Sequence, residues 1–330
     1  MKPKVILYNR LPEDLLEKLE KNCDVRQYNL ESSSNPDFLQ DLQEAEGIIG
    51  SGLKVNGELL DQTPKLKIVT NISVGYNNLD IEELTKRNIM ATNTPDVLTD
   101  TTADTVFGLL LSTARRIPEL DHYVKSGQWQ QNITQDLFGV DVHHKKLGII
   151  GMGRIGYAIA ERAHFGFKMN ILYNNRSRNI SSENELNAEF TSLDELLVNS
   201  DFVCLMAPLV PETVNLIGKR EFRLMKKSAI FINGSRGALV NEDELIYALT
   251  NREILAAGLD VYKEEPLNLE SPLRNLKNVV TLPHIGSATE ETRYKMAHLA
   301  VENLIKGLQK ETPPSLLNTE VLKLWETNGL

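Results

Sequence analysis

The chain has 330 residues, of which 41% are hydrophobic and 25% are charged, and its formal net charge is −9. It is long enough for two globular domains, and its mixed charges lack the basic stripe of a nucleic-acid-binding protein. No segment approaches the ~20 consecutive apolar residues of a membrane span, and the first apolar run is too short for a signal peptide. We therefore expect a cytoplasmic protein with no nucleic-acid partner and no membrane partner, in which Cys23 and Cys204 are core thiols.

Short apolar segments rich in β-branched residues alternate with helical patterns along the chain. The segments are apolar throughout rather than at every second position, which is typical of strands covered on both faces. Alternation of strand and helix predicts an α/β architecture with parallel sheets. In chain order, the predicted strands are residues 4–9, 47–51, 66–73, 146–151, 169–174, 201–207, 229–234, 254–261 and 278–282.

The predicted strands form two series, which we interpret as two doubly wound domains, one inserted into the other. Residues 1–98 and 287–330 should form the outer domain, and residues 99–286 the inserted one. A long apolar helix near 100–116 would lead into the inserted domain, and a helix from about 288 to 309 would lead back.

Two helix starts are predicted from capping-box spacings, Asn241 with Glu244 and Ser287 with Glu290. The polar residues near 33 should form a surface loop. From about 100 to 145, the apolar helix continues into an arm too long for a simple linker. We expect this stretch to make a homodimer.

The strongest local motif is GMGRIG, in which Gly151, Gly153 and Gly156 have the G-x-G-x-x-G spacing. A strand leads in and an amphipathic helix leads out, as in a dinucleotide-binding unit. Gly151 would permit the tight turn, Gly153 the approach of a pyrophosphate, and Gly156 close packing of helix on strand. The helix start, with Arg154 and Ile155, would present N–H groups to the phosphates. A tight turn without a ligand is the alternative.

The segment YNNRSR ends the next predicted strand, about 20 residues after the glycine turn, where an NAD site has an acidic residue. Asn174 and Asn175 stand there instead. Without a carboxylate the 2′-phosphate of NADP is not repelled, and Arg176 and Arg178, flanking Ser177, add planar cationic donors suited to phosphate. We predict a preference for NADP(H). A polar turn that still tolerates NAD is the alternative.

Three chemically versatile residues follow predicted strands of the second series: Arg236, Glu265 and His284. Ligands of α/β proteins bind at the carboxyl ends of parallel strands. Each residue alone could equally be structural: a surface arginine, a turn-capping glutamate or a buried loop histidine. His143 and His144 would face opposite ways on a strand, so we expect no metal site.

The segments GMGRIG, NGSRGALVNEDEL, AAGLDVYKEEP and LPHIGSATEETR together resemble the D-isomer-specific 2-hydroxyacid dehydrogenase family. The resemblance covers nearly the whole chain and is closest to the branch that reduces glyoxylate, hydroxypyruvate and 2-ketogluconate. It implies an NAD(P)-binding Rossmann domain at 99–286, inserted into a flavodoxin-like substrate domain. It also implies that the arm at about 100–145 makes the subunit interface.

The resemblance implies a catalytic role for each of the three strand-end residues. His284 would protonate the keto oxygen, Glu265 would orient the imidazole, and Arg236 would hold the substrate carboxylate. Asn77 departs from the family, which commonly has Asp there, and its effect on the substrate is open. The implied substrate contacts also include Val74, Gly75 and Ser287, and the implied cofactor contacts include Pro208, Asn233, Gly234, Asp260 and Gly286. The chemistry of the YNNRSR turn adds Asn175, Arg176 and Ser177 as predicted cofactor contacts.

These observations predict an NADPH-preferring reductase that converts glyoxylate or hydroxypyruvate into the D-2-hydroxy acid, with 2-ketogluconate as a further candidate substrate. One alternative is an NAD-linked D-2-hydroxyacid dehydrogenase acting on another substrate. Another is a dinucleotide-sensing protein resembling the corepressors that share this fold. We expect no peptide-docking extension or basic segment, either of which would favour that last alternative.

Overall fold

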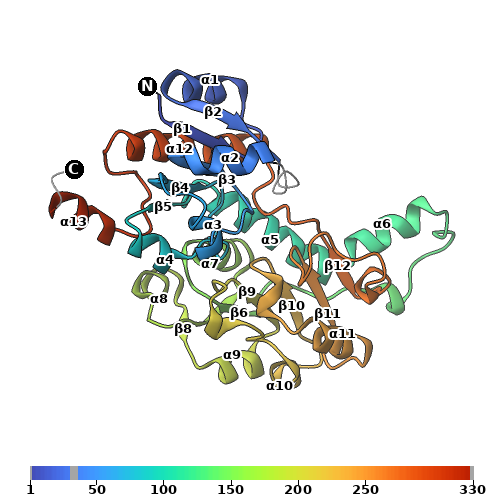
Figure 1. Cartoon of the computed structure of the whole chain (residues 1–330). Coiled ribbons are helices and arrows are strands. Elements are labelled where there is room, and N and C mark those ends of the chain that lie inside the picture. Colours follow the sequence, from blue (N-terminus) through green and yellow to red (C-terminus); the bar gives the residue numbers. More distant parts are fainter. Residues whose placement is uncertain (1, 30–35, 328–330) are drawn as a thin grey trace. The chain divides into compact units, whose positions relative to one another are not determined.

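The computed structural model describes residues 2–29 and 36–327, and the chain divides into two compact units. Unit 1 consists of Met1–Leu98 and Thr289–Leu330, and unit 2 consists of Thr99–Ala288. Each unit is built on its own parallel sheet (Figure 1). The loop expected near residue 33 lies outside the described residues.

Unit 1 contains a five-stranded sheet in the order β2-β1-β3-β4-β5, with every pair of neighbours parallel. This is the strand order of flavodoxin-like folds. The strands are β1 (Lys4–Leu7), β2 (Asp24–Gln27), β3 (Gly47–Gly50), β4 (Ile68–Asn71) and β5 (Met90–Thr92). The helices are α1 (Glu13–Asn22), α2 (Pro36–Glu44), α3 (Gly57–Leu60), α4 (Ile81–Lys86), α12 (Glu290–Leu308) and α13 (Glu320–Thr327).

Helices cover both faces of this sheet, which explains why its inner strands are apolar throughout. One core contains Leu15 and Leu19 of α1 with Leu304 of α12. The other contains Leu42 of α2 and Leu84 of α4, on the opposite side of the sheet. The long return helix α12 therefore packs on the sheet of the domain in which the chain began (Figure 1).

Unit 2 contains a seven-stranded parallel sheet in the order β12-β11-β10-β9-β6-β7-β8. The chain builds outward from β6 to β8 and then returns to place β9 beside β6, so the switch point lies between β6 and β9. The strands are β6 (Lys146–Ile150), β7 (Asn170–Asn174), β8 (Glu189–Phe190), β9 (Phe202–Leu205), β10 (Ile230–Asn233), β11 (Ala256–Leu259) and β12 (Val279–Thr281). The predicted pair of doubly wound parallel sheets, one Rossmann-like and one flavodoxin-like, is confirmed.

Helices also cover both faces of the second sheet, with α5, α7 and α8 on one side and α9, α10 and α11 on the other. The helix α7 continues into one π-helical turn, Arg162–Gly166. The helices are α5 (Thr99–Ala114), α6 (Ile117–Lys125), α7 (Arg154–Glu161), α8 (Ile180–Leu186), α9 (Leu193–Asn199), α10 (Lys219–Leu224) and α11 (Glu242–Thr250).

Three strands and one helix start differ from the sequence-based expectation. The strands β2, β5 and β8 were not predicted, because they are short or carry exposed polar residues. Asn241 caps α11 by accepting the Glu244 N–H, as expected. The prediction that Ser287 caps the long helix is wrong, since Thr289 accepts the Thr292 N–H and α12 begins at Glu290.

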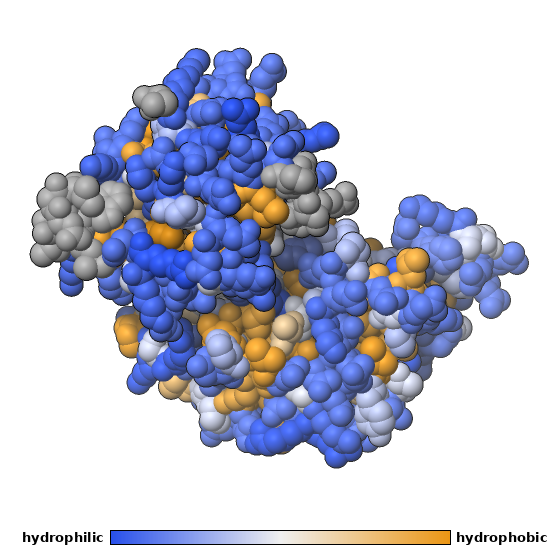
Figure 2. Space-filling model, viewed as in Figure 1, coloured by the Kyte–Doolittle hydropathy of each residue, from blue (hydrophilic) through white to orange (hydrophobic). Residues whose placement is uncertain are grey.

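Most apolar side chains lie in the cores, and the face shown in Figure 2 is largely hydrophilic with scattered apolar patches. Cys23 and Cys204 are both buried and free, which confirms the prediction of core thiols. Among residues 2–29 and 36–327, no helix has the length and apolar character that a bilayer crossing requires.

Candidate active site

His284 and Glu265 are in direct contact at the carboxyl edge of the second sheet. Nδ1 of His284 lies 2.7 Å from Oε2 of Glu265, and the backbone N–H of Tyr262 donates to Oε1 at 3.0 Å. Burial raises the pKa of Glu265, but the hydrogen bonds from His284 and Tyr262 outweigh it, so the pKa lies below its ordinary value. The carboxylate is therefore ionised and holds the imidazole through one ring nitrogen.

His284 has a left-handed backbone conformation with φ of 54°. Histidine adopts this region more often than most residues, but the conformation is uncommon and is concentrated at functional sites. The next two residues fix the loop, because Asp260 Oδ1 accepts the Ile285 N–H at 2.8 Å and Oδ2 accepts the Gly286 N–H at 2.9 Å. Asp260 thus anchors the segment that presents His284.

Arg236 lies in the turn that follows β10. Burial lowers the pKa of its guanidinium, and the charge of Glu265 acts in the opposite direction. Asn233 shapes this turn: its side chain donates to the Arg236 carbonyl at 3.1 Å and accepts the Ser235 N–H at 3.1 Å. Asn233, predicted as a cofactor contact, is only 1% exposed and supports the arginine.

The three predicted strand-end residues thus gather on one edge of one sheet. Glu265 bonds His284 directly, and Arg236 is close enough for its charge to lower the pKa of Glu265. Tyr262 was not predicted from the sequence. Its hydroxyl donates to the Leu282 carbonyl at 2.8 Å, joining the loops that carry Glu265 and His284.

The glycine turn has the steric features expected of a dinucleotide-binding turn. Gly151 has φ of +101°, and a Cβ there would lie 2.6 Å from the backbone of Met206 and Ala207. A Cβ on Gly156 would lie 2.3 Å from the Gly151 carbonyl oxygen, so only glycine lets α7 pack this closely. A Cβ on Gly153, just before α7, would have no atom within 4 Å apart from those of its two chain neighbours. This side of the turn is open.

The turn after β7 distinguishes its two arginines. Arg178 pairs with Glu183 of α8, donating from Nε at 3.0 Å and from Nη2. Arg176 is exposed and makes no hydrogen bond or ion pair with the residues that the structure describes. The side chain of Asn174 donates to the Thr191 carbonyl at 2.9 Å. Arg176 is therefore the cation of this turn that remains available to a ligand.

The other predicted contacts are distributed as follows. Pro208 is exposed after β9, while Gly234 and Ser287 are partly buried after β10 and in the segment before α12. Val74 and Gly75 follow β4 in unit 1 and are partly buried. Within the described ranges, no three His, Cys, Asp or Glu side chains cluster as metal ligands.

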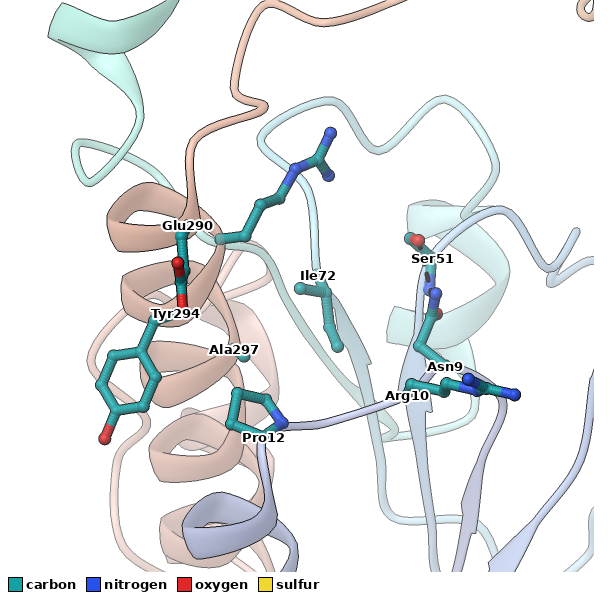
Figure 3. A pocket seen from close by; sticks show the side chains of 9 residues that line it. Asn9, Arg10, Pro12, Ser51, Ile72, Glu290, Tyr294 and Ala297 are labelled. Atoms are coloured by element: carbon teal, nitrogen blue, oxygen red, sulfur yellow. Dashed lines mark hydrogen bonds between the residues drawn. The ribbon is translucent and has the colours of Figure 1, made fainter.

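Unit 1 has a cavity of about 350 Å³ at the carboxyl edge of its sheet, which the sequence did not predict. Figure 3 shows Asn9 and Ser51 side by side, facing Glu290 and Ala297 of α12 across Ile72. Asn9 Oδ1 accepts the Ser51 N–H at 2.5 Å. Arg10, Pro12, Arg293 and Tyr294 complete the lining. The lining combines apolar side chains with two arginines and one glutamate, and ligands of this fold bind at the same sheet edge.

Residues 107–286 match the family described as "D-isomer specific 2-hydroxyacid dehydrogenase, NAD binding domain". The chain is 52% identical over 322 residues to glyoxylate/hydroxypyruvate reductase B of Klebsiella pneumoniae subsp. pneumoniae, covering 97% of this chain and 100% of the relative. This chain belongs to the D-isomer-specific 2-hydroxyacid dehydrogenase family. The predicted resemblance and the predicted enzyme class, an NAD(P)-dependent 2-hydroxyacid dehydrogenase, are confirmed.

Further members of the family show the same relationship. Glyoxylate/hydroxypyruvate reductase B of Escherichia coli (strain K12) is also 52% identical, over 97% of this chain and 99% of its own. A crystal structure of the NADPH-dependent glyoxylate/hydroxypyruvate reductase of Sinorhizobium meliloti, in complex with NADP and malonate, aligns with a TM-score of 0.88. It is 30% identical and covers 97% of this chain and 98% of its own.

Proposed function

We propose that this 2-hydroxyacid dehydrogenase reduces glyoxylate and hydroxypyruvate to the D-2-hydroxy acids, with NADPH as its preferred hydride donor. The observation that carries the proposal is the Glu265–His284 pair beside Arg236 at the ligand-binding edge of unit 2. The substrates follow from relatives that are 52% identical over nearly the whole chain and are named for them.

A dinucleotide fits the residues of unit 2. The glycine turn leaves open space beside Gly153, and α7 begins directly after it at Arg154. A helix N-terminus at such a turn is suited to binding phosphate. We propose that unit 2 is the cofactor domain and unit 1 the substrate domain. When bound, the nicotinamide supplies the hydride, and the residues of this chain bind, orient and protonate the substrate.

His284 has the geometry of the proton donor. Its Nδ1 is held by Glu265, so Nε2 is the ring nitrogen left to face the keto oxygen. The ionised Glu265 stabilises the imidazolium form before the proton is transferred. Arg236 provides donors for the substrate carboxylate. The amides of Val74 and Gly75 are the second proposed carboxylate site.

The preference for NADPH rests on Arg176. Its guanidinium is exposed and makes no hydrogen bond or ion pair with residues 2–29 and 36–327. The neighbouring Asn175 and Ser177 carry no negative charge. The 2′-phosphate of NADP would gain a charge-assisted hydrogen bond here and meet no carboxylate in this segment. The S. meliloti relative is named as NADPH-dependent.

The cavity of unit 1 extends the proposal to longer 2-keto acids. Ile72 lines it and precedes the proposed carboxylate-binding residue Val74 by two positions. Asn9 and Ser51 offer donors and acceptors suited to hydroxyl groups. We propose that 2-ketogluconate, which carries hydroxyls beyond the keto carbon, is a further substrate through this cavity.

We also propose a homodimer formed through the segment that includes α6 and residues 126–141. Figure 1 shows this segment projecting from the rest of unit 2, and α6 has no buried residue. Its exposed apolar side chains are Ile117, Val124, Trp129, Ile133 and Phe138. Such apolar exposure is typical of a protein interface. The two free, buried thiols agree with the proposed cytoplasmic location.

The proposal is tested by NADPH oxidation at 340 nm with glyoxylate, hydroxypyruvate and 2-ketogluconate, followed by chiral analysis of the product. We expect turnover with the first two and D-glycerate from hydroxypyruvate. Tight NADPH binding without turnover of any 2-keto acid would instead indicate a dinucleotide sensor. Turnover with NADH alone would indicate the NAD-linked alternative.

A further inference from the structure

The peptide groups that carry the amides of Val74 and Gly75 are both held from their carbonyl side. The Thr94 N–H donates to the Ser73 carbonyl at 3.0 Å, and Asn93 Nδ2 donates to the Val74 carbonyl at 2.9 Å. In a planar trans peptide the carbonyl and the following N–H point in opposite directions. These two bonds therefore aim the Val74 and Gly75 N–H groups away from residues 93 and 94.

The two N–H groups themselves are available. Neither the Val74 N–H nor the Gly75 N–H donates a hydrogen bond to any residue within 2–29 and 36–327. Buried or partly buried backbone N–H groups are rarely left without a partner. Successive unpaired amides form concavities that bind anions. A ligand carboxylate would satisfy both.

The asparagines that hold this segment are themselves held by hydrogen bonds to other residues of unit 1. Asn93 is 7% exposed, and its own carbonyl accepts from Asn303 Nδ2 at 3.1 Å and from Ser315 Oγ at 2.7 Å. Asn71 is 1% exposed and donates to the Gly75 carbonyl at 2.7 Å. Asn78 bonds Asn71 at 3.2 Å and donates to the Leu53 carbonyl at 2.8 Å. The segment is thus fixed at three successive carbonyls.

We infer that Asn93, supported by Asn71, is a positioning residue for the substrate carboxylate, acting through the Val74 and Gly75 amides. The inference rests on the proposed function, because it assigns the carboxylate of the 2-keto acid to these amides. Without the Asn93 side chain, the 74–75 peptide loses the bond that sets its rotation. The orientation of the Gly75 N–H is then no longer fixed, while the Asn93 carbonyl still accepts hydrogen bonds from Asn303 and Ser315.

The test compares Asn93→Ala with Asn318→Ala. Asn318 is likewise buried in unit 1, with 1% exposure against 7% for Asn93, and it also donates to a backbone carbonyl, that of Ile89 at 2.9 Å. We expect Asn93→Ala to raise KM for hydroxypyruvate about tenfold, with kcat and KM for NADPH nearly unchanged. Asn318→Ala should lower Tm and leave KM unchanged. Asn93→Asp, which keeps the shape and removes the donor, should raise KM as well.

An equal KM for wild-type and both Asn93 variants would overturn the inference, as would an equal KM rise in Asn318→Ala. If the wild-type enzyme reduces no 2-keto acid, the proposed function fails. The inference is then tested separately, by titrating the protein with oxamate and recording the backbone amide NMR signals. Shifts of the Val74 and Gly75 signals, occurring at about tenfold higher oxamate in Asn93→Ala, would support it. Unshifted Val74 and Gly75 signals would overturn it.

Discussion

Glu265 holds His284 through a hydrogen bond of 2.7 Å between Oε2 and Nδ1, and the other carboxylate oxygen is fixed by the Tyr262 N–H at 3.0 Å. A carboxylate fixed on both oxygens cannot rotate freely, so it sets the direction of the imidazole. Asp260 fixes the same loop from the backbone side by accepting the next two N–H groups. The orientation of Nε2 of His284 is therefore set by Glu265, which binds the ring, and by Asp260, which holds the loop.

Replacing Glu265 by Gln should lower kcat about 10²-fold, because the amide no longer stabilises the imidazolium and can present an NH₂ group to Nδ1. Binding of NADPH should not change, since the glycine turn is untouched. Steady-state kinetics and fluorescence titration with NADPH measure the two effects. A kcat of Glu265→Gln equal to that of the wild type would contradict the proposed role of Glu265 in orienting His284.

Arg176→Ala and Arg178→Ala form a matched pair for cofactor choice. Arg176→Ala should raise KM for NADPH about tenfold to hundredfold and leave KM for NADH unchanged, because only the 2′-phosphate is affected. Arg178→Ala should change KM for NADPH less, since the guanidinium of Arg178 already forms an ion pair with Glu183. The kcat/KM ratio for the two cofactors measures both. Equal losses with NADPH and NADH in Arg176→Ala would contradict the proposed phosphate site.

Gly156→Ala and Gly153→Ala separate packing from ligand binding in the glycine turn. A Cβ at Gly156 would overlap the Gly151 carbonyl at 2.3 Å, so this variant should lose about 1–3 kcal/mol of the free energy of unfolding. A Cβ at Gly153 meets no neighbour within 4 Å, so stability without cofactor should be unchanged while binding of the pyrophosphate weakens. Thermal unfolding with and without NADPH distinguishes the two outcomes. A Gly153→Ala protein that binds NADPH normally would contradict the assignment.

Asp201 gives a prediction about pH and stability. Burial raises its pKa, but the Lys146 N–H at 2.9 Å and Lys226 Nζ at 2.8 Å outweigh it, so the pKa is lowered. A carboxyl group with a lowered folded pKa stabilises the fold above its unfolded pKa, and this stabilisation is lost as the pH falls through the folded value.

We therefore expect Asp201→Asn to cost about 1 kcal/mol at neutral pH. The difference from wild type should stay constant down to about pH 5 and shrink below about pH 4, near the unfolded pKa of aspartate. Urea unfolding at several pH values measures it. A difference that grows as the pH falls would have the wrong sign.

The exposed apolar side chains of α6 and residues 126–141 predict a dimer interface. Charged residues introduced there should dissociate the dimer. Val124 is 51% exposed and Phe138 is 55% exposed. Replacing both by Glu should convert a dimer into monomer at micromolar concentration, because two charges would be buried without partners. Leu269→Glu is the control, since Leu269 is 77% exposed elsewhere in unit 2. Sedimentation velocity measures the mass, and a monomeric wild-type protein would contradict the proposed dimer.

Much of the fold could be predicted because buried parallel strands leave an apolar signature. Every strand that the sequence indicated is present, from β1 at Lys4–Leu7 to β12 at Val279–Thr281. The strands β2 and β8 lie at sheet edges and carry exposed residues, so neither their composition nor their length distinguishes them from loops. The start of α12 was misplaced because Ser287 and Thr289 both precede a Glu or Thr at capping distance.

The site could be predicted only in part. Parallel strands end at one edge, so the sequence indicated that Arg236, Glu265 and His284 would gather there. It could not indicate that Asp260 holds the loop after His284, or that Glu183 pairs with Arg178. These contacts depend on side-chain directions at the ends of loops, for which a single sequence has no periodic signal.

The most direct test of the account is single-turnover reduction of hydroxypyruvate by His284→Asn preloaded with NADPH. Asparagine tolerates the left-handed backbone at this position but cannot donate a proton as imidazolium does. We predict normal NADPH affinity and a hydride-transfer rate lowered at least 10²-fold. Hydride transfer at the wild-type rate would contradict the assignment of His284 as the proton donor.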